Sequence, residues 1–354
     1  MIRGGTAHRR RGLMRMLVMI CVLLVAGCVS ISSPPQQAKV TRQVTVADLS
    51  GKGILREPLV PVGNPTLAEN MALNEALTQY NVHALENPCS VGELEAFLKN
   101  YPDSPWQASL RLNLGSLYHQ SGRFTESIAA FKQSWQLMQS CQDPKVKALA
   151  DRALGELAIS LAHWGRYEEL EPLLQQSRKR SITGSATEML TAAREGLYGM
   201  KKSPGNSFLC GPYALRSVCK ALDKNSQQAQ QIIDKVRSTR QGTSLERVWL
   251  LSQKVPGLSY QVAFRAPGAP VLTPAVMHLK VNHFCAILDP KNGKYPIEDG
   301  TAGFFRQHVS MIPAVVDQQA TGYFLVPEGK LPSGWRKVSA GEAAKVWGLS
   351  LIHI

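Results

Sequence analysis

Apolar and polar positions divide the chain into two parts. From residue 66 to about residue 200 the apolar residues recur at helical spacing, which predicts a succession of helices. Helical stretches continue to about Lys254, where the pattern changes to short alternating segments typical of strands. The predicted strands are Tyr260–Phe264, Ala275–Leu279, Phe284–Leu288, Tyr295–Glu298 and Tyr323–Val326. The sequence therefore predicts an α+β protein, in which an all-α array precedes a helix packed on an antiparallel sheet.

Between Ala108 and Leu137, small and aromatic residues recur at the spacing of a known helical repeat. They are Leu114, Gly115, Tyr118, Gly122, Phe124 and Phe131. This pattern resembles the tetratricopeptide repeat, in which such residues let two antiparallel helices approach closely. A second unit has the same internal spacing, with Leu157, Ala158, Leu161, Gly165, Tyr167 and Leu174. Its turn glycine lies 43 positions after Gly122, and we expect the segment Ser140–Val146 to hold the extra residues.

Residues 94–106 resemble the closing helix of a preceding unit, so residues 66–200 are predicted to form about three helical hairpins. We expect the aromatic positions of this region to be core residues. The resemblance implies a concave face that could hold a peptide or a protein partner.

The first 27 residues resemble a bacterial lipoprotein signal. Arginines precede an apolar run from Met16 to Ala26, and small residues then lead to Cys28. This resemblance implies cleavage before Cys28 and lipidation of its thiol, with an ordinary signal peptide as the alternative. Residues 28–65 are rich in Ser, Pro and Gln and are predicted to be a flexible tether. We therefore expect a lipid-anchored protein of the bacterial cell envelope, at the outer membrane or on the periplasmic side.

The net charge of the chain does not alter this interpretation. The formal net charge is +14, and loss of the signal arginines leaves about +9. Basic and aromatic residues do not cluster together, so we expect a solvated basic surface and no nucleic-acid partner. Gly51-Lys52-Gly53 lacks the rest of a phosphate loop, and no metal-ligand spacing occurs, so we expect no bound ATP, metal or other cofactor.

The strongest chemical signal is Cys210, in Asn206-Ser-Phe-Leu-Cys-Gly-Pro-Tyr-Ala-Leu. An apolar stripe follows at helical spacing, so the thiol is predicted to lie at a helix N-terminus, where the helix dipole favours the nucleophilic thiolate. His283 follows downstream at the start of a predicted strand, and Asp299 comes after the next predicted hairpin. A cysteine nucleophile needs a base and an acid that orients the base, and these residues supply both roles. The alternative for each of these three residues is a structural role, which is the role that we predict for His278.

Residues 201 to about 327 resemble the double-glycine peptidases, the papain-like family that trims bacteriocin leader peptides. The Cys-Gly-Pro-x-Ala-Leu helix start, the His-Phe strand and the Asp-Gly after a hairpin carry the resemblance. It implies a papain-like domain over residues 201–348, with Cys210 as nucleophile, His283 as general base and acid, and Asp299 as the orienting acid. The expected substrate is a peptide cleaved after Gly-Gly.

One feature departs from this family. Its members carry a glutamine a few residues before the cysteine that donates to the oxyanion, and no glutamine occurs between Gln176 and Gln227. Asn206 is the nearest amide and is assigned that role, together with the backbone N–H of Cys210. The alternative function is an inactive papain-like adaptor that binds peptides without cleaving them.

The remaining cysteines and the last residues complete the sequence predictions. Cys89 and Cys141 could pair in an oxidising compartment, whereas Cys219 and Cys285 have apolar neighbours and are predicted to be core residues. Residues 349–354, Leu-Ser-Leu-Ile-His-Ile, resemble translated sequencing-adapter sequence, so we expect a non-native tail there.

Overall fold

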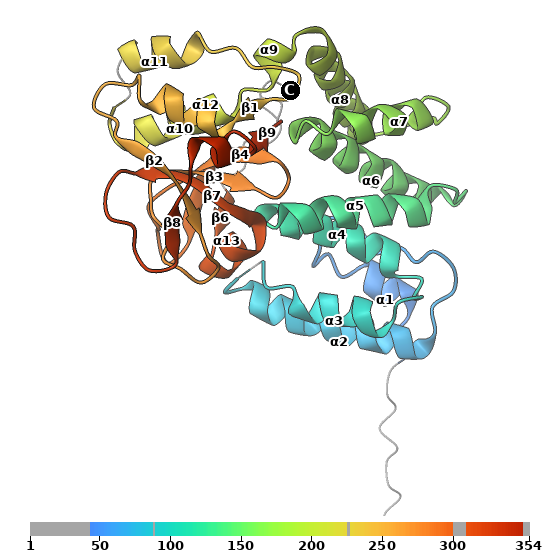
Figure 1. Ribbon diagram of the computed structural model, residues 1–354. Coiled ribbons are helices and arrows are strands. Elements are labelled where there is room, and N and C mark those ends of the chain that lie inside the picture. The colour runs from blue at the N-terminus through green and yellow to red at the C-terminus, as the bar shows by residue number, and fades with distance from the viewer. Residues whose placement is uncertain (1–42, 88, 225–226, 300–308, 350–354) are drawn as a thin grey trace, which may run out of the picture. The chain divides into compact units, whose positions relative to one another are not determined.

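The computed structural model describes residues 43–87, 89–224, 227–299 and 309–349 (Figure 1). The predicted lipoprotein signal, Cys28 and the first part of the predicted tether lie outside these residues, as does most of the predicted tail 349–354. Among the described residues, none of the helices combines the length and apolar character needed to cross a bilayer.

The first half of the described chain is helical. Its elements are α1 (Val46–Ser50), α2 (Leu67–Ala84), α3 (Gly92–Asn100), α4 (Gln107–Gln120), α5 (Phe124–Met138), α6 (Pro144–His163), α7 (Tyr167–Ser177) and α8 (Ser185–Lys202). Their starts follow local rules, since Thr66 caps α2 in a capping box with Glu69, and Asp143 caps α6 ahead of Pro144. Neighbouring helices pack on one another, notably α2 on α3, α4 on α5, and α6 on α5, α7 and α8. The tetratricopeptide-like character of this region remains a prediction.

The close approach of α4 and α5 depends on Gly115. A Cβ atom there would lie 2.5 Å from Cε1 of Phe131, so a larger residue would collide with the ring. The segment Ser140–Val146, where the extra residues were expected, is only partly a linker, because α6 begins within it at Pro144. Part of the extra length is helical, since α6 has 20 residues and α4 has 14.

The tether prediction does not hold for its second part. Residues 43–65 contain the short helix α1 and pack against the helical region, with Leu49 and Leu59 buried. The backbone N–H of Glu57 donates to the side-chain oxygen of Asn113 at 2.8 Å. The apolar residues among the prolines and glycines of this segment pack into one core with the following helices. The composition of the segment did not indicate this packing.

The second half combines short helices with strands. The helices are α9 (Pro204–Ser207), α10 (Cys210–Ala221), α11 (Gln227–Asp234), α12 (Leu245–Ser252), α13 (Pro313–Gln319) and α14 (Ala340–Ala343). The strands are β1 (Thr243–Ser244), β2 (Tyr260–Arg265), β3 (Ala275–Leu279), β4 (His283–Ile287), β5 (Tyr295–Glu298), β6 (Val309–Met311), β7 (Ala320–Pro327), β8 (Trp335–Lys337) and β9 (Trp347–Gly348). All five predicted strands are present within a residue or a few of their predicted bounds.

In the described part of the chain, seven strands form one antiparallel sheet in the order β6-β5-β4-β3-β7-β2-β8, and β1 pairs separately with β9. The protein thus mixes helices with an antiparallel sheet, as predicted.

Both faces of this sheet are buried. Along β4, Phe284 and Ala286 join one apolar cluster with α10 and α12, whereas Cys285 and Ile287 join another cluster with residues of α5, α6 and α7. This alternation follows from the two-residue period of a strand. One face therefore packs on α10 and α12, and the other packs on the helical first half.

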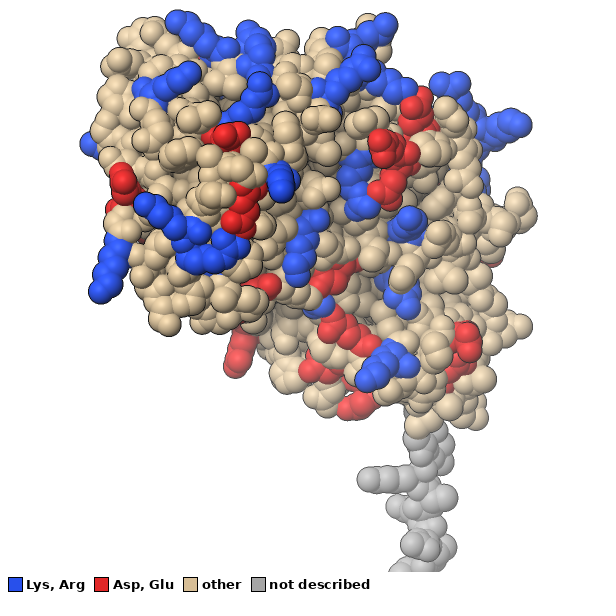
Figure 2. Space-filling view, in the orientation of Figure 1, with Lys and Arg blue, Asp and Glu red and all other residues tan. Residues whose placement is uncertain are grey.

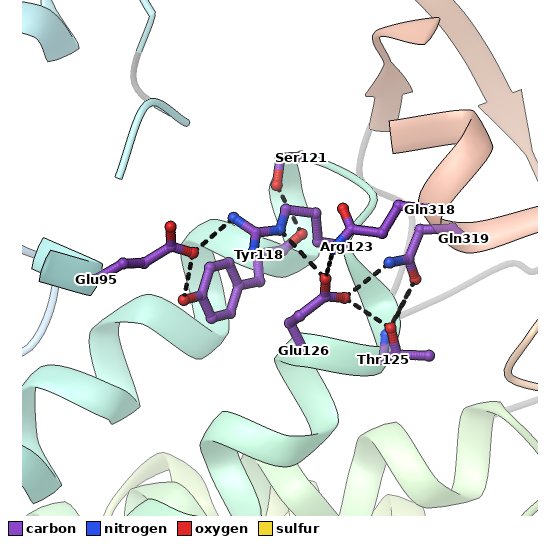
Figure 3. Close-up of polar contacts among 8 residues, drawn as sticks. All are labelled: Glu95, Tyr118, Ser121, Arg123, Thr125, Glu126, Gln318 and Gln319. Carbon is purple, nitrogen blue, oxygen red and sulfur yellow. Dashed lines mark hydrogen bonds and ion pairs between the residues drawn. The ribbon is translucent and has the colours of Figure 1, made fainter. Parts of the chain in front are cut away.

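A polar network fixes the helical first half against the sheet (Figure 3). At the start of α5, Glu126 accepts hydrogen bonds from the side chains of Gln318 and Gln319, the latter at 2.7 Å. The Gln319 side-chain oxygen accepts in turn from the backbone N–H and the hydroxyl of Thr125. Because Gln319 ends α13 immediately before β7, these bonds connect α5 to the central part of the sheet.

Candidate active site

Helix α10 begins at Cys210, as predicted, so the thiol lies at a helix N-terminus. The helix packs tightly on α12, since a Cβ atom at Gly211 would collide with Cγ2 of Val248. Pro212 occupies the first turn, where a missing N–H costs nothing. The local sequence therefore places the sulfur where the unpaired N–H groups of a first helical turn can stabilise negative charge.

A short segment of backbone covers the sulfur of Cys210. Residues 347–349, here called the closing segment, run past it with Gly348 paired to Thr243 of β1. A Cβ atom at Gly348 would lie 2.8 Å from Cys210 Sγ and 2.5 Å from the ring of Phe284, so a larger residue would not fit. Cys210 is consequently fully buried.

Two further contacts hold the closing segment. Its Leu349 N–H donates to the carbonyl oxygen of Asn282 at 2.8 Å, immediately before β4. The ring nitrogen Nε2 of His278 lies 2.8 Å from the carbonyl oxygen of Trp347, and Nδ1 lies 2.9 Å from the Thr321 hydroxyl. A carbonyl only accepts, so Nε2 carries the hydrogen in this contact. Burial lowers the pKa of His278 to about 4, which favours the neutral ring that this arrangement uses.

His283 begins β4 and lies opposite Leu279 of β3, on the face that packs against the helical first half. Its ring is fully buried, and neither nitrogen makes a hydrogen bond with the described residues. Burial lowers its pKa to about 3, although the nearby Asp299 opposes the shift. The ring is therefore neutral at pH 7, as a general base must be before it takes a proton.

Asp299 follows β5, and its Oδ2 lies 2.9 Å from Nε2 of His163, the last residue of α6. The ring of His163 lies 5.9 Å from that of His283 between centroids, and the ring of Trp164 lies 4.9 Å from that of His283. The structure thus brings Asp299 and His283 together with two residues of the helical first half. Cys210 approaches from the other face of the sheet, beside Phe284.

Sequence reasoning did not find His163 or Trp164. They belong to no catalytic motif, and their one signal is their place just before the turn glycine Gly165. That glycine has a φ of +64°, a conformation that suits glycine and ends α6 abruptly.

Asn206 lies on α9 and is exposed, whereas Cys210 is buried. The two residues therefore do not share an enclosed space in this structure. Its oxyanion role remains a prediction.

A cavity of about 550 Å³ adjoins the closing segment. Its lining includes Trp164, Tyr167, Arg240, Asn282 and Trp347. It thus combines aromatic surface with charged side chains of both signs, next to the backbone that covers Cys210. On the face shown in Figure 2, Lys and Arg are spread widely, and Asp and Glu lie among them except along the upper edge.

The other described cysteines are free thiols, including Cys89 and Cys141. Cys219 and Cys285 are fully buried, as predicted for core residues. Burial raises the pKa of Cys219 to about 11 and that of Cys285 well above its ordinary value, so both are poor nucleophiles at neutral pH. Among the described residues, we find no group of three or more His, Cys, Asp and Glu side chains that could hold a metal ion.

No family model and no curated protein matches this chain. Two solved structures are similar to it. One is a double-glycine motif protease from an AMS/PCAT transporter, in complex with its leader peptide, with 20% identity over 33% of this chain and 81% of that chain, at a TM-score of 0.26. The other is the N-terminal peptidase C39-like domain of a toxin secretion ATP-binding protein from Vibrio parahaemolyticus, with 11% identity over 36% of this chain and 97% of that chain, also at 0.26. At such TM-scores the likeness assigns neither an activity nor a residue to this chain.

Proposed function

We propose that this protein is a cysteine peptidase that cleaves peptide bonds through Cys210, His283 and Asp299. The observation that carries the proposal is the start of α10 at Cys210, with a backbone strand passing over the sulfur at a glycine. Residues 347–349 lie over the sulfur of Cys210 as a bound peptide substrate would lie. Because glycine is the residue next to the sulfur, the arrangement fits a substrate with glycine at that position, and hence cleavage after Gly-Gly.

In the proposed reaction, the Cys210 sulfur attacks the peptide carbonyl carbon and His283 takes the thiol proton. The proton then passes to the leaving amine, and water hydrolyses the thioester, which restores the thiol. Asp299 orients the His283 ring. The N–H of Cys210 and the amide of Asn206 donate to the oxyanion, a contribution of about 10²–10³ in rate for one such donor. Neither nitrogen of His283 makes a hydrogen bond within the described residues, and Cys210 packs on the other face of the sheet. The proposal therefore requires that peptide binding bring the base and the thiol into contact.

The test is cleavage of a leader-like peptide containing Gly-Gly. The variant Cys210→Ala should lose activity by about 10⁶-fold, as when a catalytic nucleophile is removed. Cys219→Ala is the matched control, because Cys219 is a fully buried cysteine on the same helix with a raised pKa, and it should keep the activity. A peptide aldehyde should label Cys210 in the wild type. Cleavage that survives in Cys210→Ala would refute the proposal.

The alternative is a peptide-binding adaptor without activity. It is favoured by the exposed position of Asn206, the proposed oxyanion donor, whereas Cys210 is buried. In that case the wild type should bind the same peptide without cleaving it, and Cys210→Ala should bind it equally well.

The proposed setting is the bacterial cell envelope. Cleavage before Cys28 and lipidation of its thiol would anchor the protein, and the helical first half, as a tetratricopeptide-like array, would bind the peptide or a protein partner. Cys28→Ser should release the protein from membranes or leave it unprocessed. Unchanged membrane partition and processing would refute the anchor.

A further inference from the structure

Three consecutive residues at the end of α6 contact three different parts of the candidate active site. His163 lies 2.9 Å from Asp299, and the ring of Trp164 lies 4.9 Å from that of His283. A Cβ atom at Gly165 would collide with the carbonyl oxygen of Leu349 in the closing segment. This α6 corner, residues 163–165, therefore touches the acid, the base and the cover of the nucleophile.

The α6 corner is held rigidly by its own backbone. The N–H of Arg166 donates to the carbonyl oxygen of Leu161 at 2.8 Å, which together with the positive φ of Gly165 closes the helix in the manner of a Schellman motif. The ring of Trp164 also packs on Phe124, with 4.8 Å between the ring centroids. The backbone that carries His163 is thus held in place before any substrate arrives.

The surroundings of Asp299 allow His163 to hold its carboxylate in place. The His163 side chain is only 2% exposed and that of Asp299 is 24% exposed, so water screens their contact little. Burial lowers the pKa of the neighbouring His119 to about 4 and that of His283 to about 3, so these two rings are neutral at pH 7. Each of Asp299 and His283 has its own restraint from the α6 corner. An acid that orients a base must itself be held in place.

We infer that the α6 corner completes the candidate active site, with His163 as the positioning residue for Asp299. The inference rests on the proposed peptidase function, because its main test measures the rate of cleavage. It gives the helical first half a part in catalysis in addition to binding the peptide. His163 lies outside residues 201–348 and yet contacts Asp299, the proposed acid of the site.

The test uses two substitutions of His163 in the full chain. In His163→Gln the amide nitrogen lies near the position of Nε2, whereas His163→Leu has similar bulk and no polar atom. With a Gly-Gly peptide, His163→Leu should lower kcat by about 100-fold with little change in KM, as expected for a misplaced catalytic group. His163→Gln should recover most of that loss. The matched control is His83→Leu, which removes a second histidine–carboxylate contact, 2.7 Å from His83 Nδ1 to Glu93 Oε1. It should leave kcat unchanged.

Two results would overturn the inference. One is a folded His163→Leu protein with wild-type kcat. The other is an equal loss in the Leu and Gln variants that follows their melting temperatures, which would indicate a purely structural role.

A separate measurement distinguishes failure of this inference from failure of the proposed function. If the wild type cleaves no peptide, the function fails, and the rate of Cys210 alkylation is then measured in His163→Leu, Asp299→Asn and the double variant. Coupled effects of the two changes support the positioning role, and additive effects refute it.

Discussion

The two faces of the central sheet contribute different parts of the candidate active site. The face toward α10 and α12 carries Phe284 and His278, and Cys210 of α10, the proposed nucleophile, packs next to Phe284. The face toward the helical first half carries His283, with Asp299 beside the α6 corner. A strand sends alternate residues to opposite faces, so the neighbours His283 and Phe284 belong to different layers.

This difference shows that the candidate site depends on both layers. The predicted peptidase domain, residues 201–348, contains all three proposed catalytic residues, yet His163 and Trp164 at the end of α6 contact two of them, Asp299 and His283. The helical first half and the sheet share one apolar cluster, which includes Phe124 of α5 and Phe324 of β7. The two layers are therefore expected to unfold together.

The largest expected effect tests this shared core. Phe131 is 2% exposed and fills the space beside Gly115, so Phe131→Ala should cost about 3–5 kcal/mol of unfolding free energy. Urea denaturation should show a single transition at a lower midpoint by both helical and aromatic signals. Leu137→Ala on the same helix is the control, because Leu137 is 49% exposed and should change stability by less than about 0.5 kcal/mol. Two separate transitions would show that the layers are independent.

A second prediction concerns how the stability of the protein depends on pH, since each face of the sheet carries one buried histidine. Burial lowers the pKa of His278 to about 4 on one face and that of His283 to about 3 on the other, from 6.5. Below pH 6.5 these two histidines take up protons in the unfolded chain but stay neutral in the folded chain. Stability is therefore full above pH 6.5 and declines as the pH falls toward these lowered values, by about 2 kcal/mol per histidine between pH 6.5 and 5.

Denaturation of the wild type and of His278→Gln between pH 7 and 5 checks this prediction. The variant should lose about 2 kcal/mol less over that range than the wild type. Leu137→Ala is the control, because it changes an exposed residue without a titratable group, and it should keep the wild-type slope. Identical slopes in all three proteins would show that His278 is not buried as the structure describes.

The smallest effect concerns the cover over Cys210. Gly348→Ala introduces a Cβ atom 2.8 Å from the sulfur and should displace the closing segment, at a cost of about 1–3 kcal/mol. Alkylation of Cys210 by iodoacetamide should then become about tenfold faster or more. Gly341→Ala on α14, where a Cβ atom meets nothing within 4 Å, should have no effect. An unchanged rate in Gly348→Ala would mean that the closing segment does not limit access.

Much of the fold could be predicted from local pattern. The five strands from Tyr260 to Val326 follow their alternation, and α10 starts where Cys-Gly-Pro indicates. Short elements such as β6 and β8 were not predicted, because three residues carry too little periodicity to be recognised.

The site was less predictable, because its assembly depends on contacts distant in sequence. The spacing of His283 and Asp299 brings them together, but the proximity of His163 depends on a contact between remote parts of the chain, from α6 to the end of β5. Alternation alone indicates that His283 and Phe284 point in opposite directions. Only the packing of α10 decides which of them faces Cys210.

The double covering of the sheet also has a consequence for synthesis. The ribosome makes the helical first half before the strands that cover its apolar face, and Phe324 emerges long after His163. At typical elongation rates this delay is roughly ten to thirty seconds, far longer than helices need to form. During that time the apolar surface of α5 and α6 has no sheet to pack against. Translation order thus makes the nascent helical layer the stage at which this protein is most exposed to aggregation and most in need of a chaperone.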